Sequence, residues 1–239
     1  MAQLLYGESK TGSHYINLEL RSKVHHLNHY SFSVSKVLNF SLHKSGRMLL
    51  VIYDNNMFRL WNLLDGRCLF KKKLGLDAET EKVANKALQV KWEPTEGMNY
   101  AVLYDKRVEV YKADQGEEPL STVTADLINF NCMEFVSTTE LILSDVQGKL
   151  TFVKNILDQE KVTITLINTK IARFRDIKCL PCCPRTLVTV STEGKISFYN
   201  IDNLRKFDLE IGNAKAVRTV KAKSRFLCLT INHLKPEVK

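Results

Sequence analysis

The stretch "YDNNMFRLWNLLDGRCLF", Tyr53–Phe70, indicates one β-hairpin and the beginning of another. Its first turn, Asp54-Asn55-Asn56, contains residues that accept the positive φ of a tight hairpin turn. The segment "MFRLW" that follows carries aromatic and apolar side chains suited to a pleated surface. The segment "LDGR" then gives a second turn signal, and apolar runs at 37–42 and 48–53 lie upstream. Four short strands are therefore predicted within residues 35–73.

The same four-strand pattern recurs three more times along the chain. The third strands "NNMFRLW", "DKRVEVY", "QGKLTFV" and "EGKISFY" end at Trp61, Tyr111, Val153 and Tyr199, which lie 50, 42 and 46 residues apart. A period of roughly 40–45 residues with four strands per repeat is typical of propeller blades. A single four-stranded sheet buries neither face alone, so blades must pack on one another. A sandwich or an up-and-down barrel is the alternative, but neither requires this repeated spacing.

The repeats predict an all-β propeller of about four full blades plus partial blades. We expect blades at 35–73, 86–124, 128–167 and 172–212, and the first strand of a closing blade within 216–232. Segments such as "FDLEIG", at 207–212, are expected to form the fourth strands. Residues 1–34 are predicted to hold the remnant of a preceding blade, and 233–239 a C-terminal tail. The four anchors Trp61, Tyr111, Val153 and Tyr199 are expected to be buried on equivalent third strands.

The composition is that of a globular protein, with 44% hydrophobic residues in 239. No apolar run approaches the length needed to span a membrane. The N-terminus lacks a basic segment followed by an apolar core, so no secretory signal is predicted. The expected location is the cytosol or the nucleus.

Six cysteines fit a reducing compartment. Four of them, Cys68, Cys132, Cys179 and Cys228, lie in apolar strand patterns and are expected to act as small buried hydrophobes. The segment "CLPCC" contains a C-x-x-C pair, but a structural zinc site needs a second pair of ligands. A redox motif of this type needs a helix N-terminus, and this one falls in a predicted loop. Structural or incidental thiols are the preferred interpretation.

No motif for catalysis is present. The sequence lacks G-x-S-x-G, H-E-x-x-H, P-loop and G-x-G-x-x-G patterns. The histidine cluster His25, His26 and His29 is interpreted as a loop ahead of a blade rather than as a metal site. We therefore expect no catalytic residue, no cofactor, no metal and no small-molecule substrate, although an enzyme on a propeller is the alternative to weigh.

Positive charge is concentrated near the C-terminus of the chain, whose formal net charge is +9. Five cations lie within eleven residues that contain no acid: Lys215, Arg218, Lys221, Lys223 and Arg225. A second group, Lys170, Arg173, Arg175, Lys178 and Arg185, lies at the start of the fourth repeat. Such clusters suit contact with a polyanion, because lysine and arginine displace condensed counterions. The alternative is a solubilising surface. The C-terminal run is the candidate RNA or partner contact.

The repeats resemble WD repeats in which the WD dipeptide is eroded. Trp61-Asn62 replaces Trp-Asp, and Tyr111, Val153 and Tyr199 occupy the tryptophan position of the other repeats. Only Asp105 keeps the turn aspartate of the family. The hydrogen-bond network usual in WD blades is therefore mostly absent, and packing is expected to hold the blades.

A narrower resemblance is carried by "FSLHKSGRMLLVIYDNNMFRLWNLLDGRCLF", "LQVKWEP", "DKRVEVY", "EGKISFYNI" and "RFLCLTI". These segments are similar to the p21-activated-kinase-interacting protein 1 family, whose fungal members are the maintenance-of-killer WD-repeat proteins. Family members form a seven-bladed ring. The resemblance therefore implies a WD-repeat β-propeller that is N-terminally incomplete, reduced, or an open arc.

The resemblance also implies a function. It points to a non-enzymatic scaffold in ribosome biogenesis and rRNA processing, acting in assembly of the large (60S) ribosomal subunit in the nucleolus and nucleus. The implied partners are the pre-60S ribosomal particle, an L24-type ribosomal-like protein and rRNA. The alternative is an adaptor that negatively regulates a p21-activated protein kinase.

Overall fold

The structure is a computed structural model. It describes residues 3–8, 14–20, 23–26, 36–75, 85–115, 118–124, 128–207, 212–222, 226 and 228–229, and only the backbone of the first three ranges. The described fold is all-β, with one five-residue α-helix and one 3-10 turn. The chain divides into two compact units, Met1–Tyr104 and Asp105–Lys239, here called the N-terminal and C-terminal units.

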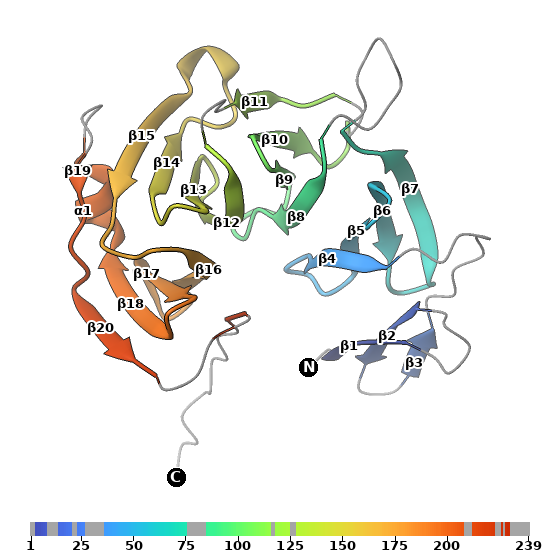
Figure 1. The fold of residues 1–239 in the computed structure, drawn as a ribbon. Coiled ribbons are helices and arrows are strands. Elements are labelled where there is room, and N and C mark those ends of the chain that lie inside the picture. Colours follow the sequence, from blue (N-terminus) through green and yellow to red (C-terminus); the bar gives the residue numbers. More distant parts are fainter. Residues whose placement is uncertain are drawn as a thin grey trace. The chain divides into compact units, whose positions relative to one another are not determined.

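The N-terminal unit begins with a three-stranded sheet, β1 (Gln3–Glu8), β2 (His14–Leu20) and β3 (Lys23–His26). Blade 1 follows, with four antiparallel strands in chain order: β4 (Val37–Leu42), β5 (Met48–Tyr53), β6 (Met57–Asn62) and β7 (Arg67–Lys73). The hairpin read from "YDNNMFRLW" is thus formed by β5 and β6, and "CLF" lies in β7 (Figure 1).

Blade 2 consists of β8 (Ala87–Trp92), β9 (Asn99–Tyr104), β10 (Arg107–Lys112) and β11 (Ser121–Thr124), in the order β11-β10-β9-β8. The chain passes from the N-terminal to the C-terminal unit in the turn after β9. The C-terminal unit continues with blade 3, formed by β12 (Phe130–Ser137), β13 (Glu140–Asp145), β14 (Leu150–Lys154) and β15 (Thr163–Asn168), with a 3-10 turn at Gln159–Lys161.

Blade 4 differs from the sequence expectation. Its first three strands, β16 (Phe174–Leu180), β17 (Cys183–Ser191) and β18 (Lys195–Asn200), follow the repeat. Its fourth strand is β20 (Arg218–Lys221), which pairs with β18. The fourth strand of blade 4 is thus β20 and not "FDLEIG", of which 208–211 lie outside the described residues. Residues 218–221 belong to blade 4 rather than to a closing blade, and 223–225, 227 and 230–232 lie outside the described residues.

The reason is that the chain leaves blade 4 after β18. It forms α1 (Ile201–Arg205), and then the two-residue strand β19 (Gly212–Asn213) pairs in parallel with β15 of blade 3. Only afterwards does it return as β20 (Figure 1). Four blades of four antiparallel strands result, with β19 as an added parallel strand on blade 3, which is the arrangement expected of a propeller-like WD fold with about four blades.

The turns explain why the third strands begin where they do. The turn residue five positions before the anchor has positive φ in three of the repeats: 60° at Asn56, 82° at Gly148 and 76° at Gly194. Left-handed backbone is accessible to Gly and tolerated by Asn. A Cβ at Gly148 would also lie 1.7 Å from the carbonyl oxygen of Ile171, so only glycine fits there.

All four anchors lie on third strands and are buried, with exposed fractions of 4% or less. Trp61 packs with Leu49, Val51, Tyr53 and Leu63, all from blade 1 and the turn that follows β6. Tyr199 instead belongs to a cluster that combines blades 3 and 4.

Side chains of one blade also bond to the backbone of the next within each unit. In the N-terminal unit, Asn39 Oδ1 and Ser41 Oγ of β4 accept hydrogen bonds from the N–H groups of Val90 and Trp92 of β8, each at 3.0 Å. The His43 ring lies edge-on to Trp92, with ring centres 4.9 Å apart.

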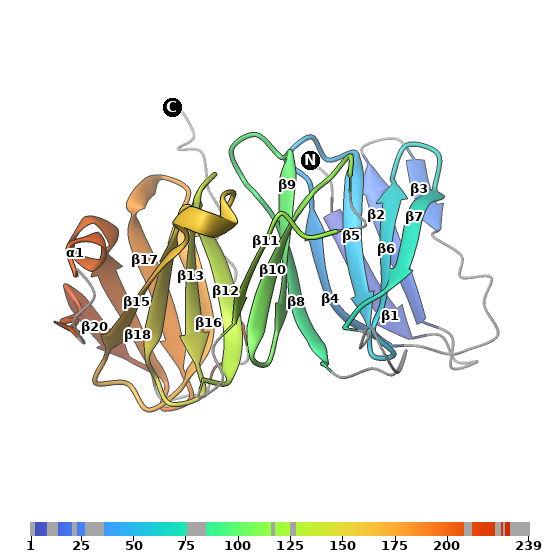
Figure 2. The same ribbon diagram turned by 90° about the horizontal axis from the view of Figure 1, so that it is seen from above.

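In the C-terminal unit the bonds run in the opposite direction. Asn131 Nδ2 of β12 donates to the Phe174 carbonyl of β16 at 2.7 Å, and Cys132 Sγ donates to the Arg175 carbonyl at 3.1 Å. Seen from above, β12 and β16 lie side by side (Figure 2). Packing and these local bonds thus join the blades.

Several smaller expectations change. His25 and His26 lie in strand β3 rather than in a loop, and His29 falls outside the described residues. Cys132 is buried, but Cys68 and Cys228 are exposed. The C-x-x-C segment was expected in a loop; Pro181 and Cys182 do form the connection between β16 and β17, but Cys179 lies in β16. The tail at 233–239 also lies outside the described residues.

Candidate binding site

The site depends on how the chain turns after β18. Asn200 caps α1, with its Oδ1 accepting a hydrogen bond from the N–H of Asn203 at 3.2 Å. Ile201 and Leu204 are buried in the cluster shared by blades 3 and 4. A polar cap and two apolar anchors therefore fix this short helix, although five residues are too few to be stable alone.

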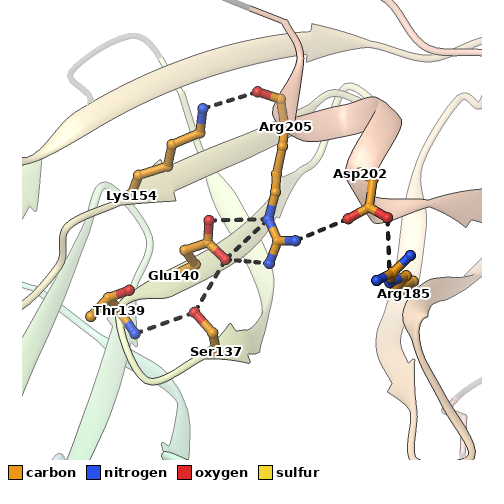
Figure 3. A network of polar contacts seen from close by, with 7 residues as sticks. All are labelled: Ser137, Thr139, Glu140, Lys154, Arg185, Asp202 and Arg205. Atoms are coloured by element: carbon orange, nitrogen blue, oxygen red, sulfur yellow. Dashed lines mark hydrogen bonds and ion pairs between the residues drawn. The ribbon is translucent and has the colours of Figure 1, made fainter.

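An ionic clamp holds α1 to blade 3. The Arg205 guanidinium donates to Glu140 of β13, with Nη2–Oε2 at 2.5 Å and Nε–Oε1 at 3.1 Å (Figure 3). Its Nη1 reaches Asp202 Oδ1 at 3.0 Å. Lys154 Nζ donates to the Arg205 carbonyl at 3.0 Å, across the end of the helix. Forked arginine–carboxylate contacts of this type are geometrically specific.

The ionic clamp also shifts the pKa of Arg205. The hydrogen bond to Glu140 raises the pKa of Arg205 further above its ordinary value. Ser137 Oγ donates to the same carboxylate at 3.1 Å. Arg185 approaches the other oxygen of Asp202 at 3.6 Å (Figure 3). Arg205 therefore carries its positive charge throughout the physiological pH range.

Beyond the clamp, a five-residue segment joins the fourth strands of two blades. The Ala214 N–H donates to the Asn168 carbonyl at the end of β15, at 2.9 Å. Three residues later the Val217 N–H donates to the Phe198 carbonyl of β18, at 2.7 Å. Residues 213–217, the strap, are thus attached at both ends.

A pocket of about 570 Å³ lies beside the strap. Its lining comes from the end of β15 and the loop after it, from β18, from the strap and from β20: Asn168, Thr169, Lys170, Ile171, Lys195, Ser197, Tyr199, Asn213, Ala214, Lys215, Ala216 and Thr219. Three of these residues are lysines and none is acidic. The volume lies in the range of small-ligand sites.

The lysines differ in their surroundings. Lys170 and Lys215 are exposed at the rim. Lys195 is partly buried, and its Nζ lies 2.5 Å from Glu193 Oε2. The rim is therefore positively charged, with one lysine already shared with a carboxylate.

Hydroxyl groups at three depths also line the pocket: Ser197 is buried, Thr169 is partly buried and Thr219 is exposed. Ser197 Oγ and Thr219 Oγ1 lie 3.1 Å apart, across the pair β18–β20. Thr169 Oγ1 donates to the Gly148 carbonyl and accepts from the Ile171 N–H at 3.3 Å. Burial raises the pKa of Tyr199, while its hydrogen bond with Thr169 acts in the opposite direction. Tyr199 therefore contributes a neutral phenol at physiological pH.

The structure divides the predicted basic run. Lys215 lines the pocket. On β20, Lys221 pairs with Lys195 and Thr219 pairs with Ser197, so these four share the pocket face. Arg218 lies on the opposite face, because neighbouring strand residues alternate. Lys223 and Arg225 fall outside the described residues.

Sequence reasoning did not assign Lys195 or the hydroxyl groups to a site. Lys170 was noted only as part of a second basic cluster. Nothing in the repeat pattern signals this pocket, because it arises from the path of the chain through α1 and β19.

Among the described residues, no group of three His, Cys, Asp or Glu side chains is placed to hold a metal ion. In the same part of the chain, no helix has both the length and the apolar character needed to cross a membrane.

Comparison with known proteins gives the relationship. The sequence is 26% identical over 197 residues to a chicken (Gallus gallus) protein named "p21-activated protein kinase-interacting protein 1-like", covering 82% of this chain and 48% of that protein. This chain is similar to the p21-activated protein kinase-interacting protein 1 proteins. The zebrafish (Danio rerio) protein of the same name is 28% identical over 106 residues, covering 44% of this chain and 26% of that protein.

The human protein named "p21-activated protein kinase-interacting protein 1" is 24% identical over 112 residues, covering 47% of this chain and 26% of that protein. No protein-family model matches the sequence. The chain spans about half the length of the chicken relative and about a quarter of the human one. Together with the propeller-like fold, the relationship supports a WD-type scaffold, a class of protein that is typically non-enzymatic.

Proposed function

We propose that this chain is a scaffold in assembly of the large ribosomal subunit. In this role it binds the pre-60S particle in the nucleolus through an L24-type ribosomal-like protein, rRNA, or both. The observation that carries the proposal is the likeness to p21-activated protein kinase-interacting protein 1 proteins over 82% of the chain.

The charge supports the same proposal. Lys215, Arg218 and Lys221 are exposed, and the described part of the chain gives none of them an ion pair. Cations presented in this way suit phosphate contacts, which position a protein on RNA without reading its sequence. Arg218 faces away from the pocket, so an RNA contact on its face leaves the pocket open.

The second candidate is an adaptor that negatively regulates a p21-activated protein kinase. The names of the chicken, zebrafish and human relatives favour it. An adaptor of this kind needs no ribosomal particle and no dependence on RNA.

Sedimentation separates the two candidates. The tagged full chain is expressed in cells, and the lysate is fractionated on a sucrose gradient with and without ribonuclease. Co-migration with large-subunit precursors that ribonuclease abolishes is the expected result. A free, light peak that co-migrates with kinase instead would overturn the scaffold proposal in favour of the adaptor.

A charge-reversal variant tests the basic run. Arg218→Glu combined with Lys223→Glu and Arg225→Glu is expected to shift the chain out of precursor fractions. The slope of log affinity against log salt, for single-stranded RNA, should fall by about 0.7 for each phosphate that the variant no longer neutralises. The matched control reverses three exposed lysines of the N-terminal unit, Lys36, Lys71 and Lys73. If both variants sediment and bind RNA alike, the basic run has no specific contact with RNA and serves only as a solubilising surface.

A further inference from the structure

We infer that the pocket beside the strap binds an anionic side chain, a carboxylate or a phosphate, carried by a peptide segment of a protein partner. Lys170, Lys195 and Lys215 converge on one concavity that contains no acidic lining residue. They come from three different elements, so their proximity results from the fold and not from a local charge run.

The interior is suited to an oxyanion. Beside the lysines lie the hydroxyl groups of Ser197, which is buried, and of Thr219, which is exposed. Ser197 is 1% exposed, and its hydroxyl contacts that of Thr219, so either group can turn to donate to an entering oxygen. Hydrogen bonds to an ionised acceptor are shorter and stronger than neutral ones.

One group competes for this position. The Glu193 carboxylate lies 2.5 Å from Lys195 Nζ, at the turn before β18. Glu193 is on the surface, outside the lining, and exposed ion pairs are weak. An incoming anion can therefore compete with Glu193 for hydrogen bonds from the Lys195 ammonium group. Lys170 and Lys215 have no such partner among the described ion pairs.

The shape favours a peptide over nucleic acid. Single-stranded RNA is held along grooves on aromatic surfaces, where successive bases stack. The aromatic residue of this pocket is Tyr199, which is 2% exposed and offers no open ring face. A volume of about 570 Å³ instead accepts one anionic side chain with its neighbouring backbone.

The floor adds selectivity for a peptide. Ile171, Ala214 and Ala216 supply apolar surface beside the polar groups. A peptide can place an apolar side chain there, next to its acidic residue. Bare phosphate or a sugar–phosphate backbone has nothing to offer this surface.

The test uses the full chain and fluorescent peptides. The probes are a short glutamate-rich peptide, the same peptide with one phosphoserine, and a glutamine-rich peptide of equal length. An oligouridylate serves as the nucleic-acid probe. We expect binding of one or both anionic peptides, weakened by salt, and no binding of the glutamine-rich peptide. The phosphoserine arm tells whether phosphate or carboxylate is preferred.

Two variants locate the site. Lys170→Gln with Lys215→Gln should weaken peptide binding about tenfold, since each exposed charge pair contributes up to about fivefold. Ala216→Phe fills the pocket without changing any charge and should weaken binding as well. Either variant alone keeps the test valid if the other fails to fold.

The controls are matched by charge and place. Arg218→Gln lies on β20 next to the pocket residue Thr219 but on the opposite face of the strand, and Lys73→Gln lies in the N-terminal unit. Both should bind the peptide as the unaltered chain does. If Arg218→Gln weakened peptide binding as much as the pocket variants, the loss would reflect the overall surface charge, and the inference would be overturned.

Other outcomes are equally decisive. Unchanged peptide affinity in both pocket variants overturns the inference, as does binding of the oligouridylate alone with sensitivity to Lys170→Gln and Lys215→Gln. The inference is separate from ribosome assembly, because the proposed function is tested by Arg218, Lys223 and Arg225 on gradients. If the chain binds the peptides but does not co-migrate with large-subunit precursors, the proposed function fails and the pocket inference stands. If it co-migrates but binds no peptide, the pocket inference fails and the proposed function stands.

Discussion

The two units join neighbouring blades by opposite means. In the N-terminal unit, Asn39 and Ser41 accept hydrogen bonds from the next blade, and aromatic rings from His43 to Trp92 fill the contact. In the C-terminal unit, Asn131 donates to the next blade and an arginine clamp supports the contact. A blade pair thus needs its backbone groups satisfied, but the direction of the bonds and the supporting chemistry are free to vary.

The largest effect is expected from aromatic burial in the N-terminal unit. Trp61 is 4% exposed and packs with Tyr53 and Leu63. Trp61→Ala should lower the free energy of unfolding by about 3–5 kcal/mol, as for other aromatic truncations in cores. Denaturant unfolding measures this loss, and hydrogen exchange should show β4–β7 losing protection before blade 4.

The control for this variant is Leu64→Ala, since the Leu64 side chain is 56% exposed. It should change stability by no more than about 0.5 kcal/mol. A loss under about 1 kcal/mol for Trp61→Ala would show that this cluster does not hold the unit together.

The direction of the inter-blade bonds is tested by one substitution made twice. Asn131→Asp removes the Nδ2 donor and sets a carboxylate against the Phe174 carbonyl, at an expected cost of about 2–3 kcal/mol. Asn39→Asp keeps the oxygen that accepts from the Val90 N–H, so it should cost under about 0.5 kcal/mol. Thermal unfolding of both variants at neutral pH measures the difference. Equal costs would mean that the opposite polarity of the two contacts has no energetic meaning.

Acid should affect the N-terminal unit through Glu93. Burial raises the pKa of this carboxyl, but the N–H groups of Gly97, Glu96 and Thr95 outweigh burial, so the pKa lies below its ordinary value. A folded pKa below the unfolded one gives stability that is complete above the unfolded pKa, about 4.3, and is lost as pH falls through the folded pKa.

Glu93→Gln should therefore destabilise the unit at neutral pH by about 1–2 kcal/mol. Because the substituted side chain cannot titrate, the variant should also lose less stability than the unaltered protein when the pH is lowered. Hydrogen exchange in β8 and β9 follows this loss. Glu96→Gln, an exposed position in the same loop, is the control and should follow the unaltered protein. An unchanged acid profile in Glu93→Gln would show that other carboxyls control the response.

The smallest effect is expected at the arginine clamp. Arg205→Lys keeps the charge but loses the fork onto Glu140, and should cost about 1 kcal/mol. Added salt should shrink this cost, whereas salt should leave the Asn39 contact unchanged. Lys161→Gln, which breaks an exposed pair with Asp158, should have no measurable effect. A salt-independent cost would mean that Arg205 acts through packing of its aliphatic stem.

The repeat pattern was sufficient to predict blades 1 to 3. Strand alternation, turn residues such as Asn56 and Gly148, and the anchor spacing all arise locally, within a few residues of each strand. Blade 4 escaped prediction because "FDLEIG" has a strand-like pattern of its own. Its fourth strand depends instead on long-range contacts, in which β19 pairs with β15, β20 pairs with β18 and Arg205 of α1 binds Glu140, 65 residues away.

The candidate site shows the same limit. The excess of cations near Lys215 was visible in the sequence, but their division between two faces was not. That division depends on the register of β20 against β18, which sets Lys221 opposite Lys195 and turns Arg218 away. The side chains that bond one blade to the next, Asn39, Ser41 and Asn131, were not foreseen either, because their partners lie more than forty residues away in the chain.

The excursion through β19 also bears on aggregation. In blades 1 to 3 the fourth strand is the next strand in the sequence after the third, so the edge of the third strand is covered soon after it forms. Here β18 must wait until the chain has passed the neighbouring blade before β20 covers it. A nascent or truncated chain that ends before Arg218 would leave β18 as an open edge, with unpaired N–H and C=O groups ready to pair with another molecule. β20 thus replaces the edge of β18 by a shorter edge of four residues that carries Arg218 and Lys221, and short, charged edge strands resist pairing with other molecules.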